Sequence, residues 1–435
     1  MKRAILMLAG LVFAGAAVSQ DLPPGVLLLS RVKAHMSEEF HRLTTLSRLE
    51  TVVREHQAAK AKMRPLDTIR LEVLTTGHKE LFASPGDRKF SENHPMSYAG
   101  SGALSDGLFG SYLKEILLSD DIASQYKGDV DVGGLRLARY DYRIPLLISG
   151  QTIRTPEGSG RVGLHGSYWV DPRTYDVIRL QMDADDFPPH LLVTEMATTI
   201  NYARTRLGNG LVVLLPEAAD VRLAKYSGEI NHNRVEFTHC RVFGAESTIN
   251  FNGPDAADQA VQFGSVVVDD TLRTLPVGLQ IAVKLHSRIS GDMAVGTLID
   301  GVVASDVTLK RSVLIPEGSA LQGRIRRLER YTDPFPYFVV GLEYTDVELH
   351  GVRHLFYADL VDFDPVPGLS QGLSTRNATT TVANPLMFGE QSTRQTIESL
   401  SLPSLPGVAT FFYKGASLDL PRDFRTVWKT RALKP

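Results

Sequence analysis

Hydrophobic and polar residues alternate with a period of two along most of this chain, which predicts a mainly β protein. In the segment DTIRLEVLT, every second residue from Ile69 to Val73 is apolar and the residues between them are charged. The same alternation recurs further along the chain, at Tyr140, Tyr142, Ile144, Ile178, Leu180, Met182, Ile200, Tyr202, Val221, Leu223, Val235 and Phe237. Strands that are apolar on one face are typical of an antiparallel sheet covered on one side.

Two segments have a helical period instead. Residues 26–43 carry an apolar stripe made of Leu28, Leu29, Val32, Met36, Phe40 and Leu43. Because Ser37, Glu38 and Glu39 stand where a membrane-surface helix would carry basic residues, we expect this stripe to pack on the sheet rather than on lipid. Residues 109–118 have a similar face, made of Phe109, Tyr112, Leu113, Ile116 and Leu117. Residues 26–252 are therefore predicted to form a curved antiparallel sheet, or half-barrel, with one or two packed helices.

Residues 166–189, GSYWVDPRTYDVIRLQMDADDFPP, are typical of a hairpin within that sheet. Asp171 and Pro172 are favoured at the first two positions of a tight turn, so a turn of the commonest type is expected there. The strand that follows then directs Ile178, Leu180 and Met182 to the covered face of the sheet.

The alternation breaks between residues 251 and 275, so residues 253–275 are expected to be a linker. A second β region, residues 276–429, contains the alternating segments LQIAVKLHSRIS and YFVVGLEYTDVEL with no helical pattern between them. This predicts a small β-barrel or sandwich. Within it, residues 364–407 are rich in Ser, Thr, Pro, Gln and Asn, which predicts a disordered insert or a loop ordered only by a partner. The final hairpin is expected to rejoin the second sheet.

The first twenty residues, MKRAILMLAGLVFAGAAVSQ, have a basic start, an apolar run and small residues before a cleavage site. This is the pattern of a secretory signal peptide, residues 1–19, and the run is too short for a transmembrane span. Removing Lys2 and Arg3 takes the formal net charge from −2 to −4, which gives no electrostatic reason to expect nucleic acid as a partner. We expect an exported bacterial protein, periplasmic or associated with the outer membrane, without a transmembrane helix in the mature chain.

Cys240 is the first residue to consider for reactive chemistry. It is the only cysteine, so no internal disulfide can form and the fold must be stabilised by its cores. Neighbouring side chains on a strand point to opposite faces, so His239 and Cys240 are not expected to share a metal or form a nucleophile–base pair. His239 has the parity of Val235 and Phe237, which predicts a buried histidine, and Cys240 is expected to be a packed thiol.

Three further features have structural explanations. Gly351 indicates a hairpin around His350 and His354, in which a cross-strand metal pair is the alternative. The acidic pairs lie near predicted element ends and lack the alternating ligands of a calcium loop; they are Asp120-Asp121, Asp185-Asp186 and Asp269-Asp270. The glycine-rich run 98–107 lacks the Lys-Ser/Thr pair of a phosphate-binding loop and is interpreted as a flexible loop or a lid over one end of the sheet. We therefore expect no enzyme activity, no metal and no cofactor.

The leader, the amphipathic helix and the antiparallel strands of residues 26–251 resemble the periplasmic lipoprotein-carrier (Lol-type) half-barrel family. The lines GSYWVDPRTYDVIRL and INYARTRLGNGLVVLLPEAADVRL are similar to its rhythm of strand, turn and strand. This resemblance implies a concave apolar sheet face that shelters acyl chains. Residues 275–363, with VGTLIDGVVASDVTLKRSVLIPEGSALQGRI, are similar to the β-barrel of type IV secretion outer-channel proteins, although an extension into a pore is not evident here. As a whole, the chain is similar to secreted bacterial envelope proteins that carry a segment like NHNRVEFTHCRVFGAESTINF.

One cluster of aromatic and aliphatic side chains is the candidate ligand site: Tyr140, Tyr142, Tyr168, Ile178, Leu180, Met182, Ile200 and Tyr202. If the helices cover it only partly, these side chains line an apolar groove for a lipid tail; if they close over it, the cluster is an ordinary core. We therefore expect a non-enzymatic cell-envelope protein that binds a lipid, a lipoprotein or an envelope component in this groove. The alternative is a structural adaptor that recruits a protein partner through strand edges and the 364–407 insert.

Overall fold

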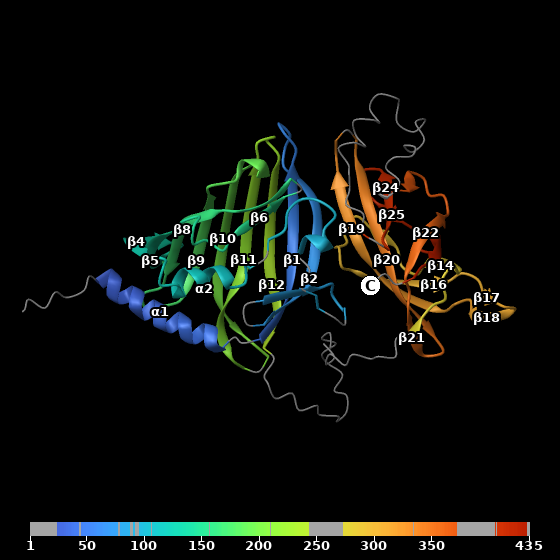
Figure 1. The fold of residues 1–435 in the computed structure, drawn as a ribbon, viewed down its shortest axis with the longest axis horizontal. Coiled ribbons are helices and arrows are strands. Elements are labelled where there is room, and N and C mark those ends of the chain that lie inside the picture. Colours follow the sequence, from blue (N-terminus) through green and yellow to red (C-terminus); the bar gives the residue numbers. More distant parts are fainter. Residues whose placement is uncertain are drawn as a thin grey trace, which may run out of the picture.

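The computed structural model describes residues 24–42, 45–76, 79–87, 90–91, 95–105, 107–155, 157–208, 210–242, 273–333, 335–371, 405 and 407–432. The expected signal peptide, most of the expected linker and most of the expected insert lie outside the described residues. The protein is mainly β, and its two large sheets lie side by side, one from each half of the chain (Figure 1).

The first sheet is a curved antiparallel half-barrel of ten strands, as the alternation predicted. Its order is β3-β2-β1-β12-β11-β10-β9-β8-β5-β4, so the last strand of the domain returns to pair with the first. The strands are β1 Thr45–Gln57, β2 Arg64–Thr76, β3 Lys79–Ala83, β4 Ser124–Val132, β5 Leu135–Ile144, β8 Gly163–Val170, β9 Val177–Asp185, β10 Val193–Arg206, β11 Val212–Lys225 and β12 Ile230–Val242. A separate hairpin, β6 Thr152–Thr155 and β7 Gly158–Arg161, is inserted between β5 and β8.

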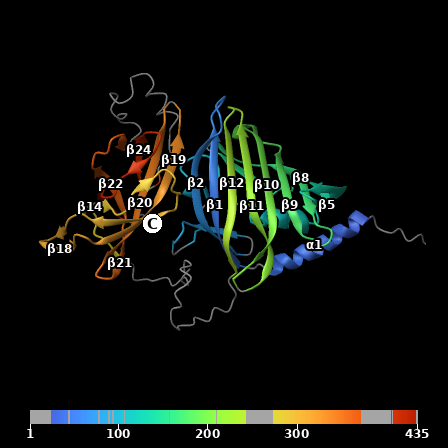
Figure 2. The same ribbon diagram turned by 180° about the vertical axis from the view of Figure 1, so that it is seen from behind.

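Two α-helices lie on one side of this sheet, α1 Pro24–Arg42 and α2 Ser111–Leu118 (Figure 1). The domain also contains the 3-10 turns η1 Pro95–Tyr98 and η2 Pro189–Leu191. Seen from behind, the long neighbouring strands β1, β12, β11, β10 and β9 face the viewer (Figure 2). The stripe of α1 packs on protein as expected, because Val32 and Met36 are buried and Leu28, Leu29 and Phe40 contact the core. Among the described residues, neither helix is long and apolar enough to cross a membrane.

The second sheet also has ten strands. They are β13 Arg273–Thr274, β14 Gln280–Leu285, β16 Leu298–Val303, β19 Ala320–Tyr331, β20 Tyr337–Leu349, β21 Val352–Leu355, β22 Ala358–Phe363, β23 Leu369–Gln371, β24 Ala409–Lys414 and β26 Arg425–Thr430. Two short pairs accompany them: β15 Ile289–Ser290 with β25 Asp419–Leu420, and β17 Val307–Leu309 with β18 Ser312–Ile315.

This sheet curls strongly enough for distant strands to meet. Three strands separate β20 from β26 in the sheet, yet the rings of Tyr344 and Trp428 lie 5.5 Å apart in its core. Phe411 of β24 likewise contacts Phe363 of β22, with ring centres 5.2 Å apart. The second domain is therefore barrel-like. Residues 364–371, assigned to the insert from the sequence, join this sheet through β23, which is too short to produce a recognisable alternation.

The two domains are joined at the open edge of β2. β3 pairs only with residues 72–76 of β2, which leaves the first half of that strand free. Val295 of the second domain bonds there, accepting from Arg70 N at 3.0 Å and donating to Thr68 O at 2.8 Å. This backbone contact covers a strand edge that would otherwise be exposed to other chains.

A buried ion pair lies on each side of the contact, and we call the two the junction pairs: Arg54–Asp67 within the first domain and Arg327–Glu329 within the second. The guanidinium and the carboxylate of Arg327–Glu329 lie 2.9 Å apart and are 1% and 0% exposed. The glycine-rich loop fits against them, since a Cβ on Gly100 would stand 2.1 Å from Arg327 Nε. This loop therefore seals the junction between the domains.

Candidate functional site

The tyrosine-rich cluster that the sequence singled out lies beneath the helices. Seven of its eight members are at most 6% exposed: Tyr140, Tyr142, Tyr168, Leu180, Met182, Ile200 and Tyr202. Ile178 is only half-buried. The pairing of β8 with β9 shifts register between Trp169 and Val170, so Ile178 loses the parity of Leu180. Seven of the eight residues are thus brought together, and the register shift accounts for the exception.

The groove expected above this cluster is closed in this structure. A shallow cleft remains at one end, lined by Tyr112, Gln151, Thr152, Ile153, Val162, Leu164, Met182, Ala184, Met196 and Thr198. Its free space is about 20 Å³, which is room for one water molecule. Val32 and Met36 of α1 and Leu113, Ile116 and Leu117 of α2 belong to the same core as the cluster and cover the rest. An acyl chain could enter only if part of this cover moved.

Two tyrosine hydroxyls in the cluster differ in their partners. Tyr142 donates a hydrogen bond to the carbonyl oxygen of Gln181 at 3.1 Å. The hydroxyl of Tyr202 is buried and has no hydrogen-bond partner among the described residues. Burial raises the pKa of both groups, so both stay protonated and neither can serve as a base. An unpaired buried hydroxyl costs about 1–3 kcal/mol, which a ligand oxygen at Tyr202 would recover.

The first turn of α1 is attached to the sheet through Tyr140. Its hydroxyl donates to the carbonyl oxygen of Gly25 at 2.7 Å, and its ring stacks on Tyr168 with centres 5.3 Å apart. Only glycine allows this approach, because a Cβ at Gly25 would stand 2.6 Å from the ring of Tyr126. Burial raises the pKa of Tyr140 to about 12, so this hydroxyl remains a donor.

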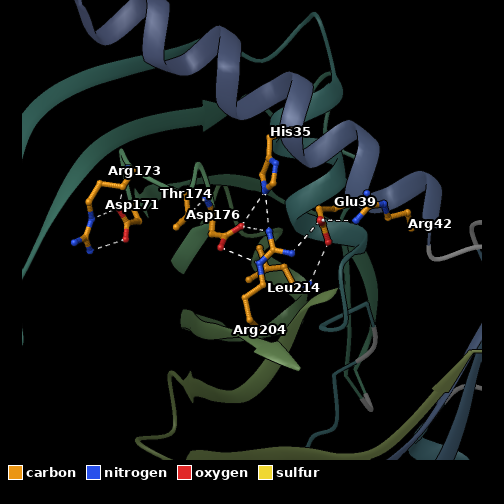
Figure 3. Close-up of polar contacts among 9 residues, drawn as sticks. All are labelled: His35, Glu39, Arg42, Asp171, Arg173, Thr174, Asp176, Arg204 and Leu214. Atoms are coloured by element: carbon orange, nitrogen blue, oxygen red, sulfur yellow. Dashed lines mark hydrogen bonds and ion pairs between the residues drawn. The ribbon is translucent and has the colours of Figure 1, made fainter. Parts of the chain in front are cut away.

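The second half of α1 is attached through a network of charged groups, which we call the α1 clamp: His35, Glu39, Asp176 and Arg204 (Figure 3). Arg204 on β10 donates to both carboxylate oxygens of Asp176, at 3.0 and 2.5 Å. It also donates to Glu39 Oε1 at 3.0 Å, and the other Glu39 oxygen accepts from Leu214 N at 3.2 Å. His35 Nε2 lies 2.9 Å from Asp176 Oδ1. One arginine therefore ties the helix to the sheet and to the β8–β9 loop.

Asp176 is the electrostatic centre of the clamp. Burial opposes its ionisation, but hydrogen bonds from Arg204 and His35 outweigh burial and lower the pKa of Asp176 below its ordinary value. The carboxylates of the clamp are buried, but the Arg204 side chain is 34% exposed to solvent. Its charged partners can therefore exchange with water when the helix moves.

The β8–β9 connection that supplies Asp176 is longer than the tight turn expected from Asp171-Pro172. Tyr175 N donates to Asp171 O at 2.8 Å, and Tyr175 has a left-handed φ of 64°. The chain closes only when Asp171 N donates to Asp176 O at 3.0 Å. These extra residues carry the Asp176 carboxylate beneath α1. The sequence carried a partial signal, since Glu39 lies within one turn of the apolar stripe residues Met36 and Phe40.

The other candidate residues form no reactive site. His239 is exposed rather than buried, because it has a φ of 52° at a bulge that interrupts the pairing of β12 with β1. Burial raises the pKa of the Cys240 thiol to about 11, so it is not an activated nucleophile. His350 and Gly351 form the turn of the β20–β21 hairpin, both with positive φ. No group of three potential metal ligands occurs among the described residues, and Asp269-Asp270 lies outside them.

Comparison with known proteins finds similar folds. No family model matches the sequence, and no curated protein matches it. A DUF1329 family protein from Desulfovibrio piger is 11% identical with a TM-score of 0.28, and the match covers 52% of this chain and 96% of that chain. A LolA superfamily protein from Nitrosomonas europaea is 10% identical with a TM-score of 0.25, covering 52% and 96%.

ComB10 of the Com type IV secretion system of Helicobacter pylori is 18% identical with a TM-score of 0.19, and the match covers 37% of this chain and 88% of that chain. One of these structures is thus a LolA superfamily protein and another belongs to a type IV secretion system. These similarities concern the fold alone.

Proposed function

We propose that this chain is a non-enzymatic protein of the cell envelope that holds an acyl chain of a lipid or lipoprotein in the tyrosine-rich cluster beneath α1. The cluster is filled when the helices are closed, so binding requires α1 to move away from the sheet. The observation that carries the proposal is the α1 clamp. Charged groups that remain partly in water hold this helix over an apolar cluster.

The attachment of α1 supports its role as a movable cover. Of its apolar stripe, only Val32 and Met36 are fully buried. Much of the remaining contact is polar, through the α1 clamp and the hydrogen bond from Tyr140. Arg204 is 34% exposed while its partners Glu39 and Asp176 are 5% and 6% exposed, so these ion pairs are worth more than surface pairs but less than fully buried ones, because water can solvate the arginine when the helix lifts. Lifting α1 therefore costs less than lifting a cover held by apolar burial alone.

The apolar cluster can supply the free energy that opening needs. Burying an acyl chain contributes roughly 0.8 kcal/mol per methylene. A chain of about ten methylenes would outweigh a clamp worth a few kcal/mol by this measure. The unpaired hydroxyl of Tyr202 supports the same site, because the ester or amide carbonyl of a lipid could accept its hydrogen bond.

Titration of the purified protein with a phospholipid that carries a pyrene-labelled acyl chain tests this function. We expect saturable binding, with the affinity reduced several-fold in Tyr202→Phe, which removes the free donor. Tyr142→Phe is the matched control, because its hydroxyl already bonds Gln181 O and its loss should lower stability without the same loss of affinity. If the wild-type protein binds no labelled lipid, the proposal fails.

A structural adaptor is the second candidate, and the closed state of the cluster favours it. β4 ends the first sheet and pairs only with β5 among the described strands. Its free edge can accept a strand from a protein partner. Failure of lipid binding together with partner capture that is lost on deletion of residues 372–404, which leaves β23 in place, would select this function.

A further inference from the structure

The loop after β5 presents three consecutive aliphatic residues to solvent, and we call Leu146, Leu147 and Ile148 the aliphatic tip. Their exposed fractions are 36%, 89% and 46%. Isolated exposed apolar residues are common, but a run of three at a loop apex is unusual unless it serves an interaction. The tip directly precedes Gln151, Thr152 and Ile153, which line the cleft at the end of the tyrosine-rich cluster.

The backbone of this loop is already supplied with hydrogen-bond donors. Arg161 Nη2 donates to the carbonyl oxygens of Leu146, Leu147 and Ser149, at 3.2, 3.1 and 2.7 Å. The carbonyl oxygen of Pro145 accepts from Ile148 N and Ser149 N, at 3.1 and 3.0 Å. Carbonyl groups that enter hydrocarbon without a partner cost several kcal/mol each. The loop therefore holds its shape and carries few unmet polar groups at its apex.

We propose that the aliphatic tip inserts into the surface of a lipid bilayer and places the adjoining cleft at the membrane. This inference deepens the proposed lipid binding, because it names where an acyl chain would pass between bilayer and protein. Arg161 lies at the base of the tip, where a cation sits at the level of the lipid headgroups while apolar residues reach the acyl chains.

A protein partner fits this surface less well. A stable protein interface needs roughly 800 Å² on each side with an apolar centre. Here the apolar surface is a projecting tip, and Arg143 beside it is exposed and paired with Asp185 at 3.5 Å. Arg143 is paired with a carboxylate and Arg161 bonds backbone carbonyl groups, so Arg161 is the one cation at the tip whose charge no described carboxylate balances. We therefore expect insertion to be driven mainly by apolar contact and to depend only weakly on anionic lipid or salt.

Co-sedimentation of the purified protein with phosphatidylcholine vesicles tests the proposal. Burial of one leucine is worth about 1.5–3 kcal/mol, so Leu147→Ser should lower the partition coefficient at least about tenfold. Leu309→Ser, at an exposed position on the β17–β18 hairpin of the second domain, is the matched control and should leave partitioning unchanged. Vesicles that include phosphatidylglycerol should bind the wild-type protein within about twofold of phosphatidylcholine alone.

A second variant reports the position of the tip directly. Leu147→Trp should be quenched by lipids brominated on their acyl chains, while the wild-type protein should not be quenched to the same extent. Equal partitioning of wild type and Leu147→Ser, or an unquenched Trp at position 147, would overturn the insertion. A change of oligomeric state in Leu147→Ser without a change in vesicle binding would show contact with another copy instead. Loss of labelled-lipid uptake with vesicle binding intact would overturn the carrier function but not the insertion.

Discussion

The α1 clamp and the junction pairs are built from the same kinds of residue, yet they differ in exposure. In the clamp the carboxylates of Glu39 and Asp176 are 5% and 6% exposed but Arg204 is 34% exposed, whereas Arg327 and Glu329 at the junction are 1% and 0% exposed. Water can replace the partners of Arg204 as α1 lifts. Removing the Glu329 carboxylate would leave the buried Arg327 guanidinium without a partner, so this ion pair costs much free energy to break. Burial, rather than the number of ion pairs, distinguishes a releasable contact from a permanent one.

The comparison also assigns different roles to the two contacts. The backbone bonds between Val295 and β2 and the ion pair between Arg324 and Asp87 cross from one domain to the other, so the second domain is fixed to the edge of the half-barrel. α1 covers the face of the same sheet with few fully buried apolar side chains. Movement is therefore expected at the helix and not between the domains.

Breaking a junction pair should have the largest effect. Glu329→Ala leaves the Arg327 guanidinium buried without its partner, so we expect the free energy of unfolding to fall by about 3–5 kcal/mol in urea denaturation. The control is Glu343→Ala, which removes the carboxylate paired with half-buried Arg326 at 2.7 Å and should cost about 1 kcal/mol or less. Equal losses in the two variants would show that burial does not separate the contacts.

The pH dependence of stability should show the cost of burying a charge at a second place in the junction, Glu72. Burial raises the pKa of Glu72 to about 7, so its ionisation opposes folding as the pH rises from its ordinary value through 7. Glu72→Gln removes this penalty. We expect the variant to be more stable than wild type by about 1–3 kcal/mol at pH 8, with the difference shrinking towards pH 4.5 in urea unfolding. A difference that does not change with pH would refute this explanation.

Loosening the clamp should have a smaller effect on stability and a larger one on lipid content. Arg204→Ala leaves the nearly buried carboxylates of Glu39 and Asp176 without an arginine, so it should lower the free energy of unfolding by about 2–3 kcal/mol. It should also raise the amount of lipid that co-purifies from bacteria, measured by mass spectrometry of the extract. Arg173→Ala is the matched control, because Arg173 pairs with Asp171 in the same loop but is 74% exposed and does not reach α1 (Figure 3). Equal lipid content in the two variants would count against the clamp.

The titration of Asp176 predicts the smallest effect. Its pKa is lowered in the folded state, so its stabilisation is present above the ordinary carboxyl pKa and is lost as the pH falls below it. We therefore expect α1 amides to exchange faster below about pH 4 than at pH 6, relative to amides of β19, after correction for intrinsic rates. Asp176→Asn should remove this difference.

Much of the fold could be predicted from period alone. Alternation located most strands of the half-barrel, though not β3 or β4, and the stripe through Val32 and Met36 located α1, because each reflects one face that must be buried. Closure of the cluster could not be predicted, since it depends on how tightly α1 and α2 fit the side chains below them. Predicting burial from every second residue also failed where the strand pairing shifts register, because the side chains beyond the shift change faces. Ile178 is therefore half-buried and His239 is exposed.

The polar contacts were harder to predict than the core. From the sequence, Glu39 is expected to be an exposed carboxylate. Only the folded chain brings Leu214 N and Arg204 within hydrogen-bond distance of it. The pair Arg327–Glu329 is separated by one residue, as expected for one face of a strand, but nothing local shows that Gly100 closes over it. Such contacts join segments far apart in the chain, so spacing alone cannot reveal them.

Amide hydrogen exchange followed by mass spectrometry, with and without a single-chain lipid, tests most directly whether α1 is a releasable cover. We expect α1 amides to open with a free energy well below that of β2 and β19 at the junction, and to exchange faster still when lipid occupies the cluster. Exchange of α1 only through global unfolding, with the same opening free energy as β19 and no response to lipid, would contradict the account.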